Sequence, residues 1–570
     1  MGSLPYSPYC VSFNNSPLRT PRKIRMVCIG SGFSGLTLAY KIIFENKLTD
    51  LIDFTIYEKE KSVGGTWLVN HYPGLKCDVP IHAYNLPWAP KHDWTTYYAC
   101  GAEIRGYIED VTRKFGLDEY IQFESRMVEA TWDEGTAKWK LKIQRDGQII
   151  EDECDIFVGA TGTQRQPNPP DIPGLQSFKG PVLHTGNWDD SADCRNKKIA
   201  VIGNGSSGVQ VFTALQKEAT SITHYIRSPT WISLNYMSQY TRNGDGQNFA
   251  FTDEEKANFR NNPKELLAYR KKLEDTSIRL FKTLIFDGTC QEVKAEFRKT
   301  LTRVMKERVQ GQPGLADKLL PTFQPWCRRL TPADGYLEAL QEANASLTNT
   351  PIDAVTPTGI RLRGGEEKDY DVIVTATGFV NNRVMPWKMH GRNGTSMHEL
   401  FKKNPDAYLS ICIPQMPNYF AVGCGPNFPI ANGPVLSALD WICSYVIRWT
   451  KKLMREDIKA MCVKTDAVEA YNIYIQEILR RTAWNRECNS WYKTGTKDEY
   501  RTGISAIYPG SLHHLREMLE CDIRGEDFDF TYRSNNKFRF LGNGMAGIDA
   551  DDDNDLAFHI DHTYKLENMI

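Results

Sequence analysis

The sequence predicts an α/β protein built from two doubly wound, Rossmann-like dinucleotide-binding domains with a helical insertion. Two short apolar runs carry this prediction: IRMVCIG at 24–30 and KIAVIG at 198–203. Each run leads into a glycine-rich turn, a helical pattern and a further apolar strand. A strand–turn–helix–strand order that occurs twice in one chain indicates two nucleotide-binding units.

Length and composition agree with this architecture. At 570 residues the chain exceeds one ordinary hydrophobic core, so two or more domains are expected. Hydrophobic residues make up 41% and charged residues 24% of the chain, and the formal net charge is −1. This balance gives no field that would attract nucleic acid or an anionic membrane. No apolar run is long enough to span a bilayer.

Cysteine usage and the N-terminus predict a soluble, cytoplasmic protein. The 14 cysteines include no CxxC pair and no metal-binding spacing, so we expect reduced thiols and no metal. The start, MGSLPYSPYC, lacks the basic region and apolar run of a signal peptide. Tyr6 stands where a myristoylation signal needs Ser or Thr.

Two strand-like runs that end in ATG mark the expected crossings between the domains. The first run ends at Gly162, and the second continues to Phe379. A charged stretch with helical spacing, 251–320, indicates the insertion. We therefore expect the first domain at 1–165 and 386–570, the second at 166–235 and 321–385, and a helical insertion at 236–320.

The first glycine motif, Gly30, Gly32 and Gly35, fits GxGxxG between a strand and a helix. The first glycine permits a tight turn, the second lets the backbone approach a pyrophosphate, and the third lets helix and strand pack closely. The helix N-terminus then offers its partial positive charge to the phosphates. Glu58 ends the next strand, where a carboxylate can bind a ribose but would repel a 2′-phosphate. This site suits FAD or NAD.

The second glycine motif has a different residue pair after its strand. The motif comprises Gly203, Asn204, Gly205, Ser206, Ser207 and Gly208. Arg227 and Ser228 close the following strand in place of an acid. A guanidinium and a hydroxyl can hold a 2′-phosphate through charge-assisted hydrogen bonds. The second site therefore suits NADPH, and the first suits FAD.

The stretch GGTWLVNHYPGLKCDVPIHAY, 64–84, resembles the flavin-contacting segment of type I Baeyer–Villiger monooxygenases, which are class B flavoprotein monooxygenases. His71 and Lys76 stand where arginines are frequent in that family. The resemblance implies that the flavin is lined by Thr66, Trp67, Asp78, Val79 and Tyr84. It places Lys76, Cys77 and Asp78 toward the nicotinamide, and Gly65 and Val128 among the cofactor contacts.

A linker between the two glycine motifs carries the family fingerprint, FxGxxxHxxxW followed by Asp. Its fixed residues are Phe178, Gly180, His184, Trp188 and Asp189. The related N- and S-oxygenating enzymes usually have Tyr and a basic residue at the last two positions. We interpret His184 as a structural or hinge residue rather than a proton-transfer group.

The segment WCRRLTP, 326–332, resembles the family's basic pair. By that match Arg329 is the catalytic arginine, Arg328 helps hold the NADPH phosphate, and Asp78 orients Arg329. A permanently charged guanidinium would keep a flavin peroxide anionic and stabilise the tetrahedral adduct. The segment CNSWYK, 488–493, implies that Trp491 lies over the cofactor, with ordinary core packing as the alternative. This segment is most similar to fungal-type members.

The resemblance implies an enzyme that uses FAD, NADPH and O2 to convert a hydrophobic ketone to an ester or lactone through a C4a-peroxyflavin. A cyclic or polycyclic ketone of fungal secondary metabolism is expected as the small-molecule substrate. Two alternatives stay open: an N- or S-oxygenating flavin monooxygenase, and a non-catalytic flavin-binding protein. A disulfide reductase would need a redox-active cysteine pair beside the flavin, and the sequence has no such pair.

Overall fold

The computed structural model describes residues 14–287, 290–381, 383–402, 404–551 and 553–560. The N-terminal segment used for the signal-peptide and lipidation predictions lies outside these residues. Within the described chain, no helix combines the length and apolar character needed to cross a bilayer.

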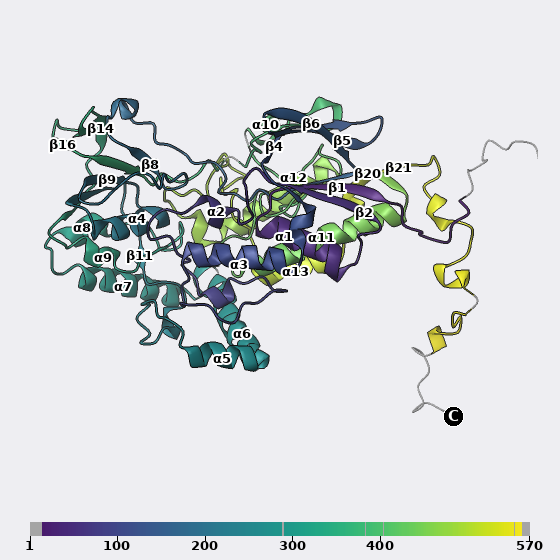
Figure 1. Ribbon diagram of the computed structural model, residues 1–570, viewed down its shortest axis with the longest axis horizontal. Helices are drawn as coiled ribbons and strands as arrows, with labels where there is room; N and C mark the ends of the chain where they lie inside the picture. Colours follow the sequence, from purple (N-terminus) through teal and green to yellow (C-terminus); the bar gives the residue numbers. More distant parts are fainter. Residues whose placement is uncertain (1–13, 288–289, 382, 403, 552, 561–570) are drawn as a thin grey trace, which may run out of the picture.

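The first glycine motif belongs to a parallel five-stranded sheet. Its strand order is β19 (Tyr419–Ala421), β7 (Ile156–Gly159), β1 (Ile24–Ile29), β2 (Ile52–Tyr57) and β3 (Ile121–Gln122). The predicted strand β1 is almost entirely buried, as expected for a parallel strand covered on both faces. Helix α1 (Phe33–Tyr40) follows it and packs against α11 (Val435–Arg455), as Figure 1 shows.

The second glycine motif belongs to a second parallel sheet of the same size. Its strand order is β13 (Ala345–Thr348), β10 (Ser221–Tyr225), β9 (Lys198–Ile202), β17 (Val372–Thr375) and β8 (Val182–His184). Helix α4 (Ser206–Gln216) follows β9. In both sheets the chain order reverses at the motif strand, because β1 lies between β2 and β7, and β9 between β10 and β17. Dinucleotides bind at such reversal points. The predicted fold class is confirmed.

Smaller elements surround these two sheets. A four-stranded sheet beside the first domain comprises β18 (Lys388–His390), β4 (Ser125–Asp133), β5 (Lys138–Arg145) and β6 (Gln148–Cys154). An antiparallel sheet beside the second domain comprises β14 (Ile352–Val355), β15 (Gly359–Leu362) and β16 (Glu367–Asp369). Short paired strands are β11 (Ile232–Ser233) with β12 (Thr331–Pro332), and β20 (Ile458–Val463) with β21 (Phe528–Tyr532). Further helices are α2 (Thr66–Val69), α3 (Gly101–Lys114), α9 (Tyr336–Ala339), α10 (Met397–Phe401), α12 (Thr465–Arg480) and α13 (Leu512–Glu520).

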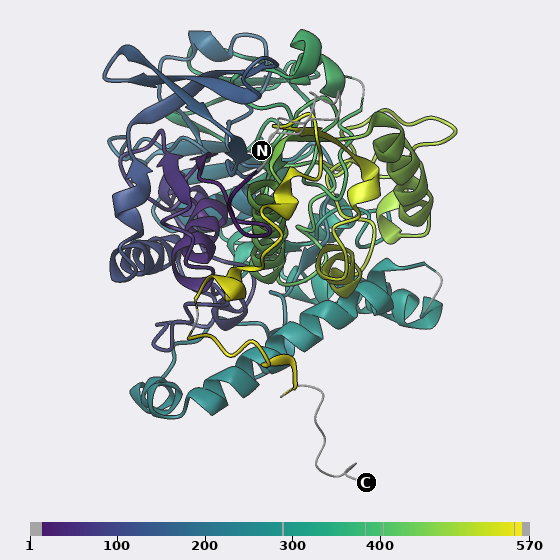
Figure 2. The same cartoon turned by 90° about the vertical axis from the view of Figure 1, so that its right-hand side faces the viewer.

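The charged stretch predicted as an insertion is helical. It forms α5 (Asp253–Asn261), α6 (Pro263–Leu280), α7 (Gln291–Arg308) and α8 (Leu315–Leu319). A capping box of Thr252 and Glu255 starts α5, and a proline starts α6. Leu273 of α6 belongs to the core of the first domain, whereas Leu301 and Met305 of α7 belong to the core of the second. The insertion therefore bridges the two domains, and its teal helices run along one edge of the molecule (Figure 2).

Cys327 and Cys488 form a disulfide, so the prediction of reduced thiols is wrong for this pair. The two residues are 161 positions apart, and the fold brings their Cα atoms to 6.2 Å. A sequence search for closely spaced cysteines cannot find such a pair, because only the tertiary structure makes them neighbours. The thiols of Cys28, Cys77, Cys424 and Cys443 are free, as predicted, and all four are buried.

Candidate active site

A cavity of about 1810 Å³ joins the two glycine motifs. Both domains, the insertion and the C-terminal region contribute to its wall. Most residues predicted from the sequence line it: Gly30, Gly32, Glu58, Gly65, Thr66, Trp67, Lys76, Cys77, Asp78, Val79, Tyr84, Gly203, Asn204, Gly205, Ser206, Ser207, Arg227, Ser228, Arg328, Arg329 and Trp491. Residues as far apart in the chain as Gly30 and Trp491 thus meet at one site.

Each glycine of the first motif is required for a different structural reason. Gly30 has φ +109°, and a Cβ there would lie 2.7 Å from the carbonyl oxygen of Ala160. A Cβ at Gly35 would lie 2.1 Å from the oxygen of Gly30. At Gly32 the nearest atom is the Cα of Gly65, at 3.7 Å, so this position is open toward the cavity. Gly30 and Gly35 therefore allow close packing, and Gly32 leaves room for a pyrophosphate.

Glu58 lies directly after β2 and is only 7% exposed. Its Oε2 accepts hydrogen bonds from the Ser31 amide (2.8 Å) and hydroxyl (3.0 Å), and its Oε1 accepts one from the amide of Glu60 (3.0 Å). These bonds fix the carboxylate beside the first glycine loop, where a ribose would need an acceptor. The position fits a nucleotide with a free 2′-hydroxyl.

The second motif repeats the same division of roles. Gly203 has φ +107°, and its Cβ would lie 2.5 Å from the oxygen of Ala376. A Cβ at Gly208 would lie 1.9 Å from the oxygen of Gly203. A Cβ at Gly205 would meet no atom within 4 Å apart from its chain neighbours, so this position is open. Asn204 donates a 2.9 Å hydrogen bond to the Ser228 carbonyl, which ties the loop to the chain after β10.

His224 forms a hydrogen bond to the backbone of the second glycine loop, a role that no sequence motif indicated. Its Nε2 lies 2.8 Å from the carbonyl oxygen of Gly203, and its Nδ1 lies 2.9 Å from the hydroxyl of Tyr336. Because a carbonyl only accepts, Nε2 carries the proton and Nδ1 accepts from Tyr336. Burial lowers the pKa of His224 to about 4, so the ring is neutral near pH 7.

Arg227 and Arg328 form a cationic corner of the cavity. Arg227 is exposed just beyond β10, and Arg328 donates a 3.2 Å hydrogen bond to the Pro229 carbonyl. The Arg328 guanidinium also lies 5.3 Å from the ring centre of Phe323. Burial, and then the neighbouring Arg227, lower the pKa of Arg328. Within the described ranges neither arginine has an acidic partner, so the corner fits a phosphate.

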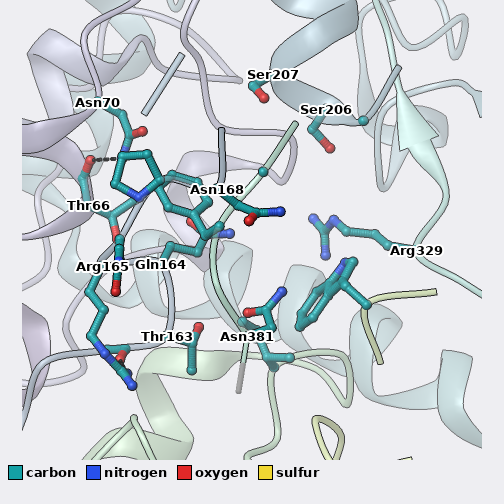
Figure 3. A pocket seen from close by; sticks show the side chains of 18 of the residues that line it. Thr66, Asn70, Thr163, Gln164, Arg165, Asn168, Ser206, Ser207, Arg329 and Asn381 are labelled. Carbon is teal, nitrogen blue, oxygen red and sulfur yellow. Dashed lines mark hydrogen bonds between the residues drawn. The ribbon is translucent and has the colours of Figure 1, made fainter. Parts of the chain in front are cut away.

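Arg329 is held at the cavity wall by Asp78. The Nη2 of Arg329 lies 2.6 Å from the Oδ2 of Asp78, and the guanidinium lies 5.3 Å from the ring centre of Tyr236. Burial alone would lower the pKa of Arg329, but Asp78, Tyr236 and Tyr492 outweigh it and raise the pKa. The side chain is 30% exposed and points into the cavity (Figure 3). A charged donor is therefore presented to whatever the cavity holds.

The flavin-like stretch is tied to the second domain beside Arg329. Lys76 forms a 2.6 Å ion pair with Asp334, and its carbonyl accepts a 3.1 Å hydrogen bond from Gln210 of α4. Tyr72 donates to Gln210 at 2.9 Å. These contacts cross between the domains, and no sequence motif pointed to Asp334 or Gln210.

Aromatic side chains of the predicted site lie on the cavity wall. The indole of Trp67 donates a 3.3 Å hydrogen bond to the hydroxyl of Tyr84, and their ring centres are 5.8 Å apart. Trp491 also lines the cavity, with its ring centre 4.7 Å from that of Tyr492. Burial raises the pKa of Cys77 to about 12, so this thiol is protonated near pH 7.

Some predicted residues lie away from the cavity. Gly35 and Gly208 pack helix against strand. Val128 lies at an irregularity in the pairing of β4 with β5, and its neighbours Arg126 and Met127 line the cavity in its place. None of the linker residues Phe178, Gly180, His184, Trp188 and Asp189 lines the described cavity.

The surroundings of His184 agree with a structural role. Its Nδ1 accepts a 2.9 Å hydrogen bond from the Gly186 amide, and its Nε2 lies 3.3 Å from the hydroxyl of Thr377. Thr377 donates at 2.6 Å to the carbonyl of Asn168. The imidazole thus lies where both connecting segments cross between domains. Burial lowers its pKa.

Polar residues on these crossings also line the cavity, although we did not predict them. They include Thr163, Gln164, Arg165, Asn168 and Asn381 (Figure 3). In the same view Thr66 and Asn70 lie opposite Arg329, with Ser206 and Ser207 at the upper rim. The two ATG runs were the available signal, since each crossing begins at one of them.

The fold and the cavity define a protein with two dinucleotide-binding domains around a shared site. Residues 23–271 match the model of the flavin-binding monooxygenase-like family. The FAD-binding monooxygenase tazF of Aspergillus terreus is 43% identical over 546 residues, which cover 96% of each chain. A Baeyer-Villiger monooxygenase of Pseudomonas aeruginosa is 31% identical over 473 residues, 83% of this chain and 85% of that protein. This chain belongs to the flavin-binding monooxygenase family, as the resemblance predicted.

Solved structures share the fold. The cyclohexanone monooxygenase from Rhodococcus sp. Phi1 bound to NADP+ superimposes with a TM-score of 0.74 at 24% identity, over 90% of this chain and 100% of that one. The closed structure of cyclohexanone monooxygenase gives a TM-score of 0.75 at 22% identity, with the same coverage. At these identities the likeness concerns the fold.

Proposed function

We propose that the protein catalyses the Baeyer–Villiger oxidation of a hydrophobic cyclic or polycyclic ketone to an ester or lactone, with FAD, NADPH and O2. One observation carries the proposal: a guanidinium, Arg329, is held 2.6 Å from Asp78 at the wall of a cavity shared by two dinucleotide loops. Similarity to the Baeyer-Villiger monooxygenase of Pseudomonas aeruginosa supports the same reaction.

The first loop fits FAD. Its backbone is open at Gly32, and Glu58 is a buried acceptor at the ribose position. Thr66, Trp67 and Tyr84 would line the isoalloxazine ring. When bound, FAD supplies the oxygen activation that no side chain of the cavity can provide.

The second loop fits NADPH. Gly205 is open for the pyrophosphate, and the N-terminus of α4 begins at the next residue. Arg227 and Arg328, which lack acidic partners in the described chain, would hold the 2′-phosphate.

Arg329 would stabilise negative charge on the reacting oxygen atoms. The guanidinium stays protonated at any physiological pH, because Asp78 and two tyrosines raise its pKa. Asp78 uses one guanidinium nitrogen, and the others have no protein acceptor in the described chain. Removing such a preorganised donor typically costs about 10²–10³ in rate.

The rest of the wall supports a hydrophobic substrate. Apolar side chains from the insertion and the C-terminal region line the cavity: Leu280, Phe281, Ile285, Phe428, Ile430 and Trp484. Phe281, Ile285, Ile430 and Trp484 belong to the same hydrophobic cluster as Trp491. A wall of this kind excludes water from the reacting atoms and offers few hydrogen bonds to a polar ligand.

The test is a ketone screen on the purified flavoprotein. We expect ketone-dependent NADPH oxidation with equal O2 uptake, and an ester or lactone that carries one added oxygen by mass spectrometry. Arg329→Ala should lose about 10²–10³ of this rate, whereas Arg361→Ala, at an exposed site on β15, should not. Formation of only N-oxides or sulfoxides would refute the ketone reaction, and no NADPH oxidation at all would indicate a binding protein.

A further inference from the structure

The Cys327–Cys488 disulfide joins two segments of the cavity wall. Cys327 immediately precedes Arg328 and Arg329, and Cys488 lies three residues before Trp491. Both segments contribute to the cavity, and the Cα atoms of the two cysteines are 6.2 Å apart. The bond therefore fixes the arginine-bearing chain against the tryptophan-bearing chain.

Regular structure gives these segments little support. Residues 320–330 and 486–511 lie in no helix or strand. The nearest strand after Arg329 is β12, which has only two residues. Trp326 adopts φ +68°, a left-handed conformation that large side chains rarely adopt and that surrounding contacts must maintain.

The noncovalent contacts near the disulfide are both polar and apolar. Lys493 donates a hydrogen bond to the Arg486 carbonyl, and Arg486 pairs with Asp287 at 2.8 Å. The ring of Trp326 lies 6.1 Å from that of Tyr236 and 6.0 Å from that of Phe297. Trp326 and Trp491 pack against the same hydrophobic cluster, which includes Tyr492. Apolar contacts are non-directional and do not by themselves fix a side chain to a fraction of an ångström. Asp78 fixes the tip of the Arg329 side chain at 2.6 Å, and the covalent bond fixes the backbone segment that carries it against the segment of Trp491.

We propose that Cys327 and Cys488 are positioning residues, whose disulfide holds Arg329 and Trp491 in register over the cavity. This inference rests on the proposed function, in which Arg329 acts on the reacting oxygen atoms. When the bond is absent, the guanidinium segment moves, NADPH oxidation continues, and reducing power is lost as hydrogen peroxide.

The first measurement compares two double variants. Cys327→Ser/Cys488→Ser removes the bond, and Cys290→Ser/Cys521→Ser replaces two exposed free cysteines as a control. We expect the first variant to lose roughly 10²-fold in ester formation, as small misplacements do, with most NADPH consumption diverted to peroxide. The control should match the wild type. Unchanged ester-to-peroxide ratios in the first variant would overturn the proposal.

The second measurement does not depend on ester formation. Hydrogen–deuterium exchange should accelerate about tenfold in peptides covering 324–331 and 486–494, and stay unchanged in β1 and β9. If the wild type forms no ester while these peptides loosen in the variant, the positioning role stands and the proposed function falls. If exchange does not change, the positioning role is wrong.

A third arm covers failure of the variant to fold. Wild-type enzyme treated with a phosphine reductant, then reoxidised, should lose and regain ester formation. Alkylation of the untreated native protein should leave Cys327 and Cys488 unlabelled. Labelling of both as free thiols would overturn the proposal directly.

Discussion

The choice between NADPH and NADH depends on Arg227 in this structure. Arg227 stands just beyond the end of β10, much as Glu58 stands after β2 in the first domain. The substitution Arg227→Ala removes a guanidinium that lies beside Arg328 and has no acidic partner among the described residues. We expect it to weaken productive binding of NADPH and to leave NADH, which has no 2′-phosphate, nearly unaffected.

The expected loss in kcat/KM for NADPH follows from the contact between Arg227 and the 2′-phosphate that the substitution removes. Hydrogen bonds to charged groups contribute about 1.5–3 kcal/mol, which corresponds to roughly 10- to 150-fold in kcat/KM. Arg227 is exposed, so solvent screening favours the lower end, about tenfold. Arg328 is more buried and touches the same site, so its loss should cost more, and the double variant should depart from additivity.

The assay is kcat/KM for NADPH and for NADH at low and high salt. Arg361→Ala is the control, since Arg361 is an exposed arginine of the same domain paired with Asp353. The NADPH-specific loss should shrink at high salt, because screening already weakens the wild-type contact. Equal losses with both cofactors, or no loss with either, would refute the assignment of Arg227 to the 2′-phosphate.

Three further predictions concern other parts of the site. Gly205→Ala should change the unfolding free energy by no more than about 0.5 kcal/mol but raise KM for NADPH. Gly203→Ala should lower Tm, because Gly203 has φ +107° and lies against the Ala376 carbonyl. Equal losses of Tm in the two variants would contradict this difference. His224 has a pKa of about 4 when folded and 6.5 ordinarily, so the unfolded chain binds the extra proton and stability falls as pH drops through this window, by about 3 kcal/mol. Urea unfolding of His224→Asn near pH 7 and pH 4.5 should show a smaller pH dependence, and an unchanged slope would contradict it. Asp78→Asn should lower kcat about tenfold with a smaller change in KM, since it removes the charge that orients the guanidinium 2.6 Å away; a change confined to KM would contradict that role.

The nucleotide loops were predictable because their determinants are local. Gly30, Gly32 and Gly35 fall within six residues, and each answers a contact that the strand–turn–helix unit imposes wherever it occurs. The acid after β2 and the arginine after β10 belong to the same unit, because each lies within two residues of the end of the strand that follows the glycine motif. Pattern and position together therefore located both sites.

The supports of those sites were not predictable in this way. Lys76 pairs with Asp334 and His224 with Tyr336, and no local pattern connects the members of either pair. Val128 stays a prediction: it lies at a pairing irregularity in β4, and its neighbours Arg126 and Met127 are the residues that line the cavity. Sequence spacing carries no information about such contacts until the strand registers are known.

Arg329 could be located by a family resemblance, whereas its surroundings depend on contacts that no local sequence pattern contains. Its carboxylate partner, Asp78, belongs to the first domain, and the aromatic ring beneath it, Tyr236, opens the insertion. The residue two positions before it is bonded to Cys488 of the C-terminal region. Three other parts of the chain thus contact Arg329 or its segment, and the helices α6 and α7 connect the cores of both domains. A rotation of one domain against the other would shift Asp78 relative to Arg329. The position of the guanidinium at the cavity wall therefore depends on how the two domains are arranged, and not only on the segment that contains Arg329.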